Sequence, residues 1–135
     1  MSKKKVYPYR YHEDFFMPEG IQDECIRLCR QNTPHRFTYH VLKNLKKRDK
    51  SHAIKGGEKR LKKLLRKLEL NWVKPFEVYA DKDKHPKKYA MRIEMSESED
   101  VIFVLSDRVV ITYYINNKND PHHTLGNKEN PYSME

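Results

Sequence analysis

The chain has 135 residues, of which 37% are hydrophobic and 35% are charged, and its formal net charge is +9. A chain of this length can bury roughly two-thirds of the surface that it exposes when unfolded, so we expect one core and one domain. No stretch approaches the roughly 20 apolar residues of a membrane span, and no apolar signal segment follows Lys3–Lys5. We therefore expect a cytoplasmic location and no membrane partner.

Residues 1–17 are predicted to form an N-terminal arm that contains Tyr7, Tyr9 and Tyr11. Alternate side chains of a strand point to the same face, so these rings would pack along the edge of a sheet. Tyrosine rings can also stack on nucleobases. We favour packing.

Three helices are predicted between the arm and Leu70. The first runs from Pro18 to about Gln31. The second begins near Thr38, whose side chain suits an N-cap, and loses its pattern around Asp49. The third runs from about Glu58 to Leu70 and shows the apolar stripe of an amphipathic helix. The residues expected to face the core are Ile21, Cys25, Leu28 and Cys29 in the first, Val41, Leu42 and Leu45 in the second, and Leu61, Leu64, Leu65 and Leu68 in the third.

The two cysteines lie four residues apart, so their side chains share one face of the first predicted helix. We interpret Cys25 and Cys29 as core thiols of a protein from a reducing compartment. The alternative is half of a metal site, but a Cys-x3-Cys pair without a second pair is weak support for one. The seven histidines also lack the spacing of a zinc motif, so most are expected on the surface. We expect no metal and no cofactor.

From Pro75 onward the apolar period changes from 3.6 to 2, which predicts strands at about 75–80, 88–95, 100–106 and 108–115. The last two should form an antiparallel hairpin around Ser106–Asp107. The predicted fold class is therefore α+β, with N-terminal helices packed on a four-stranded antiparallel sheet in a single domain over 18–115. Residues 116–135, which include His122 and His123, are predicted to form a mobile C-terminal tail.

The positive charge is concentrated in one part of the chain. Residues 43–70 contain twelve Lys or Arg against three acids, so they carry the whole excess charge. A solvated helix face is the simpler interpretation. The density of charge favours a phosphate backbone, because neutralising phosphates releases counterions. The expected partner is RNA, with DNA as the alternative, the oligomeric state stays open, and the predicted contacts are Lys43, Lys47, Lys59, Arg60, Lys63, Arg66 and Lys67.

Cleavage of RNA without a metal needs a general base, a general acid and cations that stabilise charge in the transition state. His40 is the candidate base, since Lys43 and Lys47 on the same helix face favour the neutral imidazole. Strand alternation places polar side chains on the sheet face that the helices leave uncovered, where they would meet the RNA. The candidate catalytic residues are His40, Arg48, Arg92, Glu94 and Tyr114.

The segment Phe37–Arg48, with the sequence FTYHVLKNLKKR, resembles the histidine-containing helix of RegB-type phage endoribonucleases, which belong to the RelE-like ribonucleases. In this likeness His40 matches the helical histidine and Arg48 a later basic position. Asn44 stands where the family has an arginine, and the family's second histidine, on the next helix, has no counterpart. In outline the likeness covers residues 35–115.

The resemblance implies helices packed on a small antiparallel sheet and cleavage of messenger RNA, including ribosome-associated messenger RNA, without a metal. The reaction would be attack by the 2′-hydroxyl on the adjacent phosphate.

The competing hypothesis is a non-enzymatic, nucleic-acid-binding regulatory protein that uses the basic helix 58–70. No Gly-rich phosphate loop or nucleophile elbow supports a different chemistry.

Overall fold

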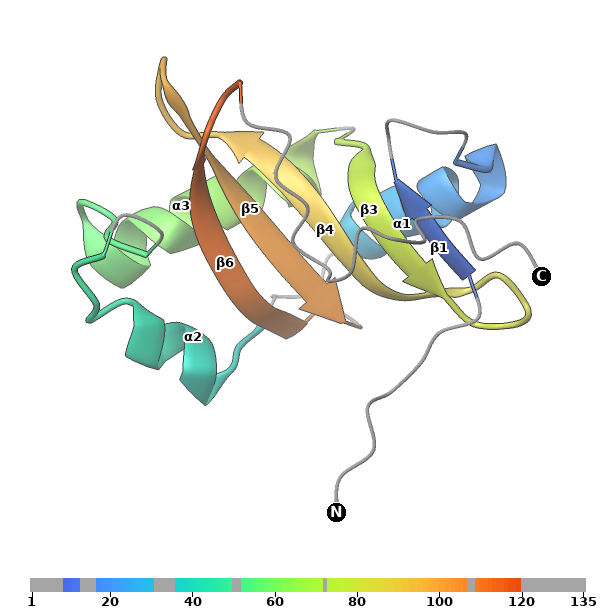
Figure 1. Ribbon diagram of the computed structural model, residues 1–135, viewed down its shortest axis with the longest axis horizontal. Coiled ribbons are helices and arrows are strands. Elements are labelled where there is room, and N and C mark those ends of the chain that lie inside the picture. Colours follow the sequence, from blue (N-terminus) through green and yellow to red (C-terminus); the bar gives the residue numbers. More distant parts are fainter. Residues whose placement is uncertain are drawn as a thin grey trace.

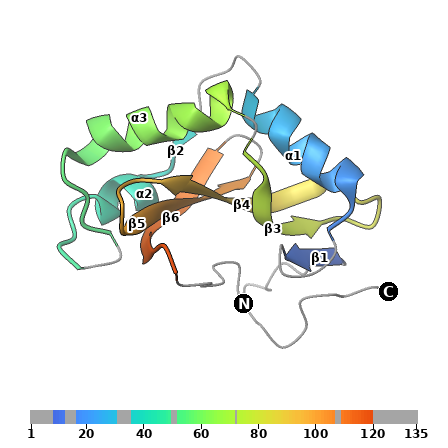
Figure 2. The same ribbon diagram turned by 90° about the horizontal axis from the view of Figure 1, so that it is seen from above.

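The computed structural model describes residues 9–12, 17–30, 36–49, 52–71, 73–106 and 109–119. Figures 1 and 2 show α1 and α3 lying together over one face of a sheet, while α2 lies beside β6. The α+β class is therefore confirmed. The elements in chain order are β1 (Tyr9–His12), α1 (Glu19–Arg30), β2 (Arg36–Phe37), α2 (Tyr39–Asn44), α3 (Gly57–Leu70), β3 (Pro75–Ala80), β4 (Pro86–Glu94), β5 (Glu99–Ser106) and β6 (Val109–Asn117).

The sheet has six strands in the order β1-β3-β4-β5-β6-β2. The four predicted strands are β3 to β6, and each pairs antiparallel with the next. The predicted number of strands is wrong, because β1 adds antiparallel to β3 and β2 adds parallel to β6. A strand of two residues, such as β2, is too short to show an alternating pattern in the sequence. It pairs because the chain passes alongside β6 at this point.

Within β1, Tyr11 is buried and its ring stacks on the Tyr9 ring with centroids 6.3 Å apart. Packing along a sheet edge is thus confirmed for these two tyrosines, whereas Tyr7 lies outside the described residues. At the other end of the chain, β6 continues to Asn117, two residues into the predicted tail. Residues 120–135 and the expected turn residue Asp107 lie outside the described residues.

The second predicted helix is shorter than expected. Thr38 caps α2 as predicted: its Oγ1 accepts from the Val41 N–H at 3.3 Å and donates to the Ile111 carbonyl of β6 at 3.1 Å. The helix ends at Asn44 instead of near Asp49. Leu42 was expected to face the core but is 37% exposed. The reason is that a helix of six residues in contact with β6 buries only one narrow face.

The core lies between the helices and one face of the sheet. All four leucines of the predicted stripe on α3 are buried, as are Cys25 and Cys29 on α1. Both cysteines are free thiols, and burial raises the pKa of each, that of Cys29 to about 12. The interpretation as core thiols is confirmed. The sheet residues in this cluster include Tyr89, Met91, Phe103 and Tyr113.

The opposite face of the sheet differs from the expected open, polar surface. Its middle is a second apolar cluster of buried side chains, against which Tyr79, Ile111 and Tyr114 pack. The expectation that this face is free to hold RNA is therefore wrong for its centre. The difference arises because β3, β4 and β5 carry apolar residues at outward positions too, namely Phe76, Ala90, Ile102 and Val104.

Candidate nucleic-acid interface

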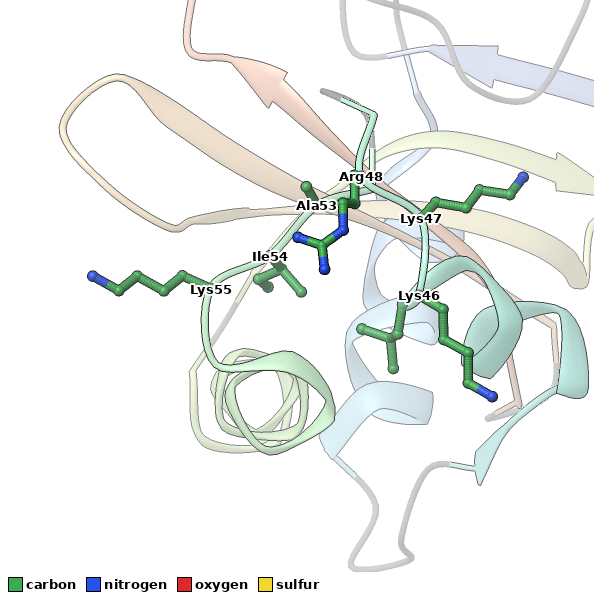
Figure 3. A pocket seen from close by; sticks show the side chains of 7 residues that line it. Lys46, Lys47, Arg48, Ala53, Ile54 and Lys55 are labelled. Carbon is green, nitrogen blue, oxygen red and sulfur yellow. The ribbon is translucent and has the colours of Figure 1, made fainter.

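The connection between α2 and α3 forms an open hollow of about 680 Å³ with a basic lining (Figure 3). Figure 3 shows the Arg48 side chain turned towards Ile54, while the Lys47 and Lys55 side chains extend away in opposite directions. No acid is among the lining residues, so the hollow offers a polyanion positive charge next to apolar side chains. The lining residues are Leu45, Lys46, Lys47, Arg48, Ala53, Ile54 and Lys55.

The path of this connection depends on a glycine. Gly56 adopts φ 97° immediately before α3, a left-handed conformation that side chains disfavour. A Cβ at this position would also lie 2.9 Å from the Cβ of Arg60. Gly56 therefore allows the chain to turn sharply from the hollow into the basic helix, and it places Lys55 on the rim.

His52 attaches the connection to the sheet. The Tyr113 hydroxyl of β6 donates to the His52 carbonyl at 2.7 Å. The His52 ring packs edge-on against the Tyr113 ring at 5.5 Å and at a tilt against the Tyr114 ring at 5.7 Å. Burial, with a contribution from the Asp49 charge, raises the pKa of Tyr113 to about 12, so its hydroxyl stays a hydrogen-bond donor. The basic hollow thus has a fixed position relative to β6.

His52 also pairs with Asp49, which lies 2.9 Å from its Nδ1. This hydrogen bond holds the pKa of the Asp49 carboxyl below its ordinary value. If Asp49 accepts from Nδ1–H, Nε2 keeps the lone pair that can exchange a proton. Sequence reasoning grouped His52 with the scattered surface histidines, although the spacing Asp-x2-His was visible. Its contacts with two tyrosines of β6 could be found only in the structure.

His40, the candidate base, is exposed on the first turn of α2. Its Nε2 lies 3.1 Å from Nδ2 of Asn44, a residue that is only 1% exposed. Asn44 Oδ1 is buried too and has no hydrogen-bond partner within the described residues. Asn44 is therefore a hydrogen-bond partner of the exposed His40 ring at Nε2.

Two of the other predicted catalytic residues, Arg92 and Glu94, lie elsewhere. Arg92 donates from Nε to Asp100 Oδ2 at 2.8 Å and from Nη2 to the Asn117 carbonyl at 2.9 Å. Lys118 Nζ lies 3.0 Å from a carboxylate oxygen of Asp100 and also 3.0 Å from one of Glu94. Arg92 and Glu94 thus belong to an ion-pair network that joins β4, β5 and the end of β6.

Arg92 and Glu94 bond to Asp100, Asn117 and Lys118, none of which belongs to α2 or to the connection that follows it. Tyr114 is closer to the hollow, since its ring contacts His52. The structure therefore brings Tyr114 near the basic connection but does not gather all five candidates in one site. Their catalytic roles stay predictions.

The predicted contacts on α3 divide into two groups. Lys59, Lys63 and Arg66 are exposed on the side away from the leucine stripe. Arg60 and Lys67 instead reach the sheet, where they donate to the carbonyls of Met95 and Glu94, each at 3.2 Å. Arg60 is half-buried, whereas Lys67 stays exposed.

Comparison with protein-family models, curated proteins and solved structures finds no match for this chain. Across the described ranges, no helix has both the length and the apolar character needed to cross a membrane. In the same ranges, no three His, Cys, Asp or Glu side chains are grouped as potential metal ligands. Any function assigned to the chain rests on the geometry of its own residues.

Proposed function

We propose that this chain is an endoribonuclease that binds RNA in the basic hollow and cleaves it without a metal ion. The observation that carries the proposal is the position of His40. Its exposed ring is hydrogen-bonded to the buried Asn44, and the next residue along the chain, Leu45, begins the lining of the hollow. A candidate proton acceptor and a candidate phosphate site therefore occupy consecutive parts of the same segment.

In this reaction His40 accepts the proton of a ribose 2′-hydroxyl, and the resulting oxygen attacks the adjacent phosphorus. The bond from phosphorus to the 5′-oxygen breaks, which leaves a 2′,3′-cyclic phosphate and a 5′-hydroxyl that takes up a proton from a general acid. Arg48 and Lys47 would stabilise the negative charge that develops on the phosphate oxygens. The general acid stays unassigned.

Asn44 has a defined part in this scheme. Its side-chain amide can donate to His40 Nε2 or, turned over, accept from Nε2–H, because the amide oxygen and nitrogen are assigned by their hydrogen bonds. The second arrangement leaves the lone pair on Nδ1, and a general base needs such a lone pair. The scheme requires that arrangement in the RNA-bound protein.

The proposed likeness to RelE-like ribonucleases is supported by the antiparallel strands β3 to β6 and by the helices that cover one face of them. Messenger RNA, including messenger RNA on ribosomes, is the substrate class that this likeness suggests. The proposal places the chemistry at His40 and Arg48, and Tyr114 lies against His52 of the same connection. Arg92 and Glu94 are assigned to holding the sheet face together, on the strength of their ion pairs.

A second candidate function is nucleic-acid binding without cleavage. It is favoured by the exposed cations of α3, Lys59, Lys63 and Arg66, which need no catalytic residue to hold an RNA or DNA backbone. The ion pairs of Arg92 and Glu94 favour it too, since they leave fewer groups for chemistry.

The test is a cleavage assay on end-labelled single-stranded RNA, with and without a chelator, and with and without ribosomes. We expect fragments with 2′,3′-cyclic phosphate ends in amounts that the chelator does not change. His40→Ala should lower the rate about 10²- to 10⁴-fold, the range for a lost general base, with little change in RNA affinity. His85→Ala is the matched control, because its side chain is 69% exposed in the β3–β4 turn. If the protein binds RNA tightly but the RNA stays intact under all conditions, the cleavage proposal is wrong and nucleic-acid binding is the function that remains.

A further inference from the structure

α2 carries an exposed apolar patch, formed by Tyr39 and Leu42. Tyr39 is 80% exposed and Leu42 is 37% exposed, and apart from Leu70 they are the large hydrophobic residues that stand out as exposed in the described part of the chain. Positions three apart on a helix share a face. The opposite face of α2 is used for packing, since Val41 and Asn44 are buried.

Positive charge surrounds this patch. Lys43 is four residues after Tyr39 and therefore on the same side of α2, and Lys46 and Lys47 follow at once; all three are exposed. α2 contains no acid, and the first acid after it, Asp49, is paired with His52. Two copies of the chain that met at this patch would bring their lysines together and repel each other. A polyanion with flat apolar groups would complement both the positive charge of the lysines and the exposed tyrosine ring.

We propose that Tyr39 stacks on an unpaired nucleobase of an RNA strand whose phosphates lie along Lys43, Lys46 and the basic hollow. The inference rests on the RNA binding of the proposed function and specifies its substrate: single-stranded RNA. A base in a duplex is already stacked and paired, so its face is not available to an aromatic side chain. Every base has a π-face, so the contact would tolerate different sequences.

The experiment compares wild type with Tyr39→Ala and Tyr39→Phe on two probes, a single-stranded oligouridine and an RNA duplex of the same length. Stacking on an aromatic side chain contributes about 1–3 kcal/mol per base, so Tyr39→Ala should weaken single-strand binding about 5- to 150-fold. Tyr39→Phe should restore it, and duplex binding should not change. Because no charge is removed, the salt dependence of binding should stay the same.

Leu70→Ala is the matched control, since Leu70 is 67% exposed at the end of α3 and is not part of the patch. Equal single-strand affinity of Tyr39→Ala and wild type would overturn the stacking inference and leave RNA binding intact. Absence of RNA binding by wild type would overturn the proposed function as well. A change of oligomeric state in Tyr39→Ala, seen by light scattering with RNA affinity unchanged, would assign the patch to a second copy of the chain instead.

Discussion

The basic hollow makes a quantitative prediction about salt. Within the described residues, no salt bridge joins the lining cations Lys46, Lys47, Arg48 and Lys55 to an acid. They can therefore neutralise phosphates, and release of the cations condensed on the nucleic acid makes the affinity depend on salt. We consider the double variant Lys47→Gln with Arg48→Gln, which removes two charges and keeps side chains of similar polarity.

For single-stranded nucleic acid, each phosphate contact contributes about 0.7 to the slope of log affinity against log salt concentration. Loss of two contacts should therefore flatten the slope by about 1.4. When the salt concentration is raised from 0.05 to 0.2 M, the fold-loss of affinity should therefore be about seven times smaller for the double variant than for wild type.

The assay is fluorescence anisotropy of a labelled single-stranded RNA, titrated at four or five salt concentrations. The control is Lys82→Gln with Lys84→Gln, which removes the same charge from the exposed β3–β4 turn, on the side of the sheet away from α2 (Figure 1). Its slope should equal that of wild type. If both double variants flatten the slope equally, the net charge of the protein governs binding and the hollow is not a specific site.

Two further substitutions test the structural assignments. Arg92→Gln should destabilise the protein by about 1.5–3 kcal/mol in urea denaturation, because the Asp100 carboxylate, only 12% exposed, loses its guanidinium partner; slower cleavage at unchanged stability would instead support a catalytic Arg92. Leu64→Ala on α3 should lower the free energy of unfolding by about 2–5 kcal/mol and leave the RNA affinity of the folded protein unchanged. A Leu64→Ala protein as stable as wild type would mean that this leucine is not in the core.

Several features could be predicted from the sequence, because each is a local pattern repeated within one element. The leucine stripe of α3 follows the helical period, and the alternation along β4 separates Tyr89, Met91 and Ile93 from Arg92 and Glu94. The cap at Thr38 depends only on backbone groups three residues away. The concentration of positive charge in residues 43–70 is a property of composition and needs no fold.

Only the tertiary structure decided which groups meet across elements. Arg92 was predicted to be catalytic from its strand position alone, but its partner Asp100 comes from β5 and the carbonyl that it binds comes from the end of β6. His52 had no special local pattern beyond Asp49, yet the packing of the connection on β6 places it against Tyr113 and Tyr114. Such contacts depend on strand order and on the path of loops, and local periodicity carries no information about either.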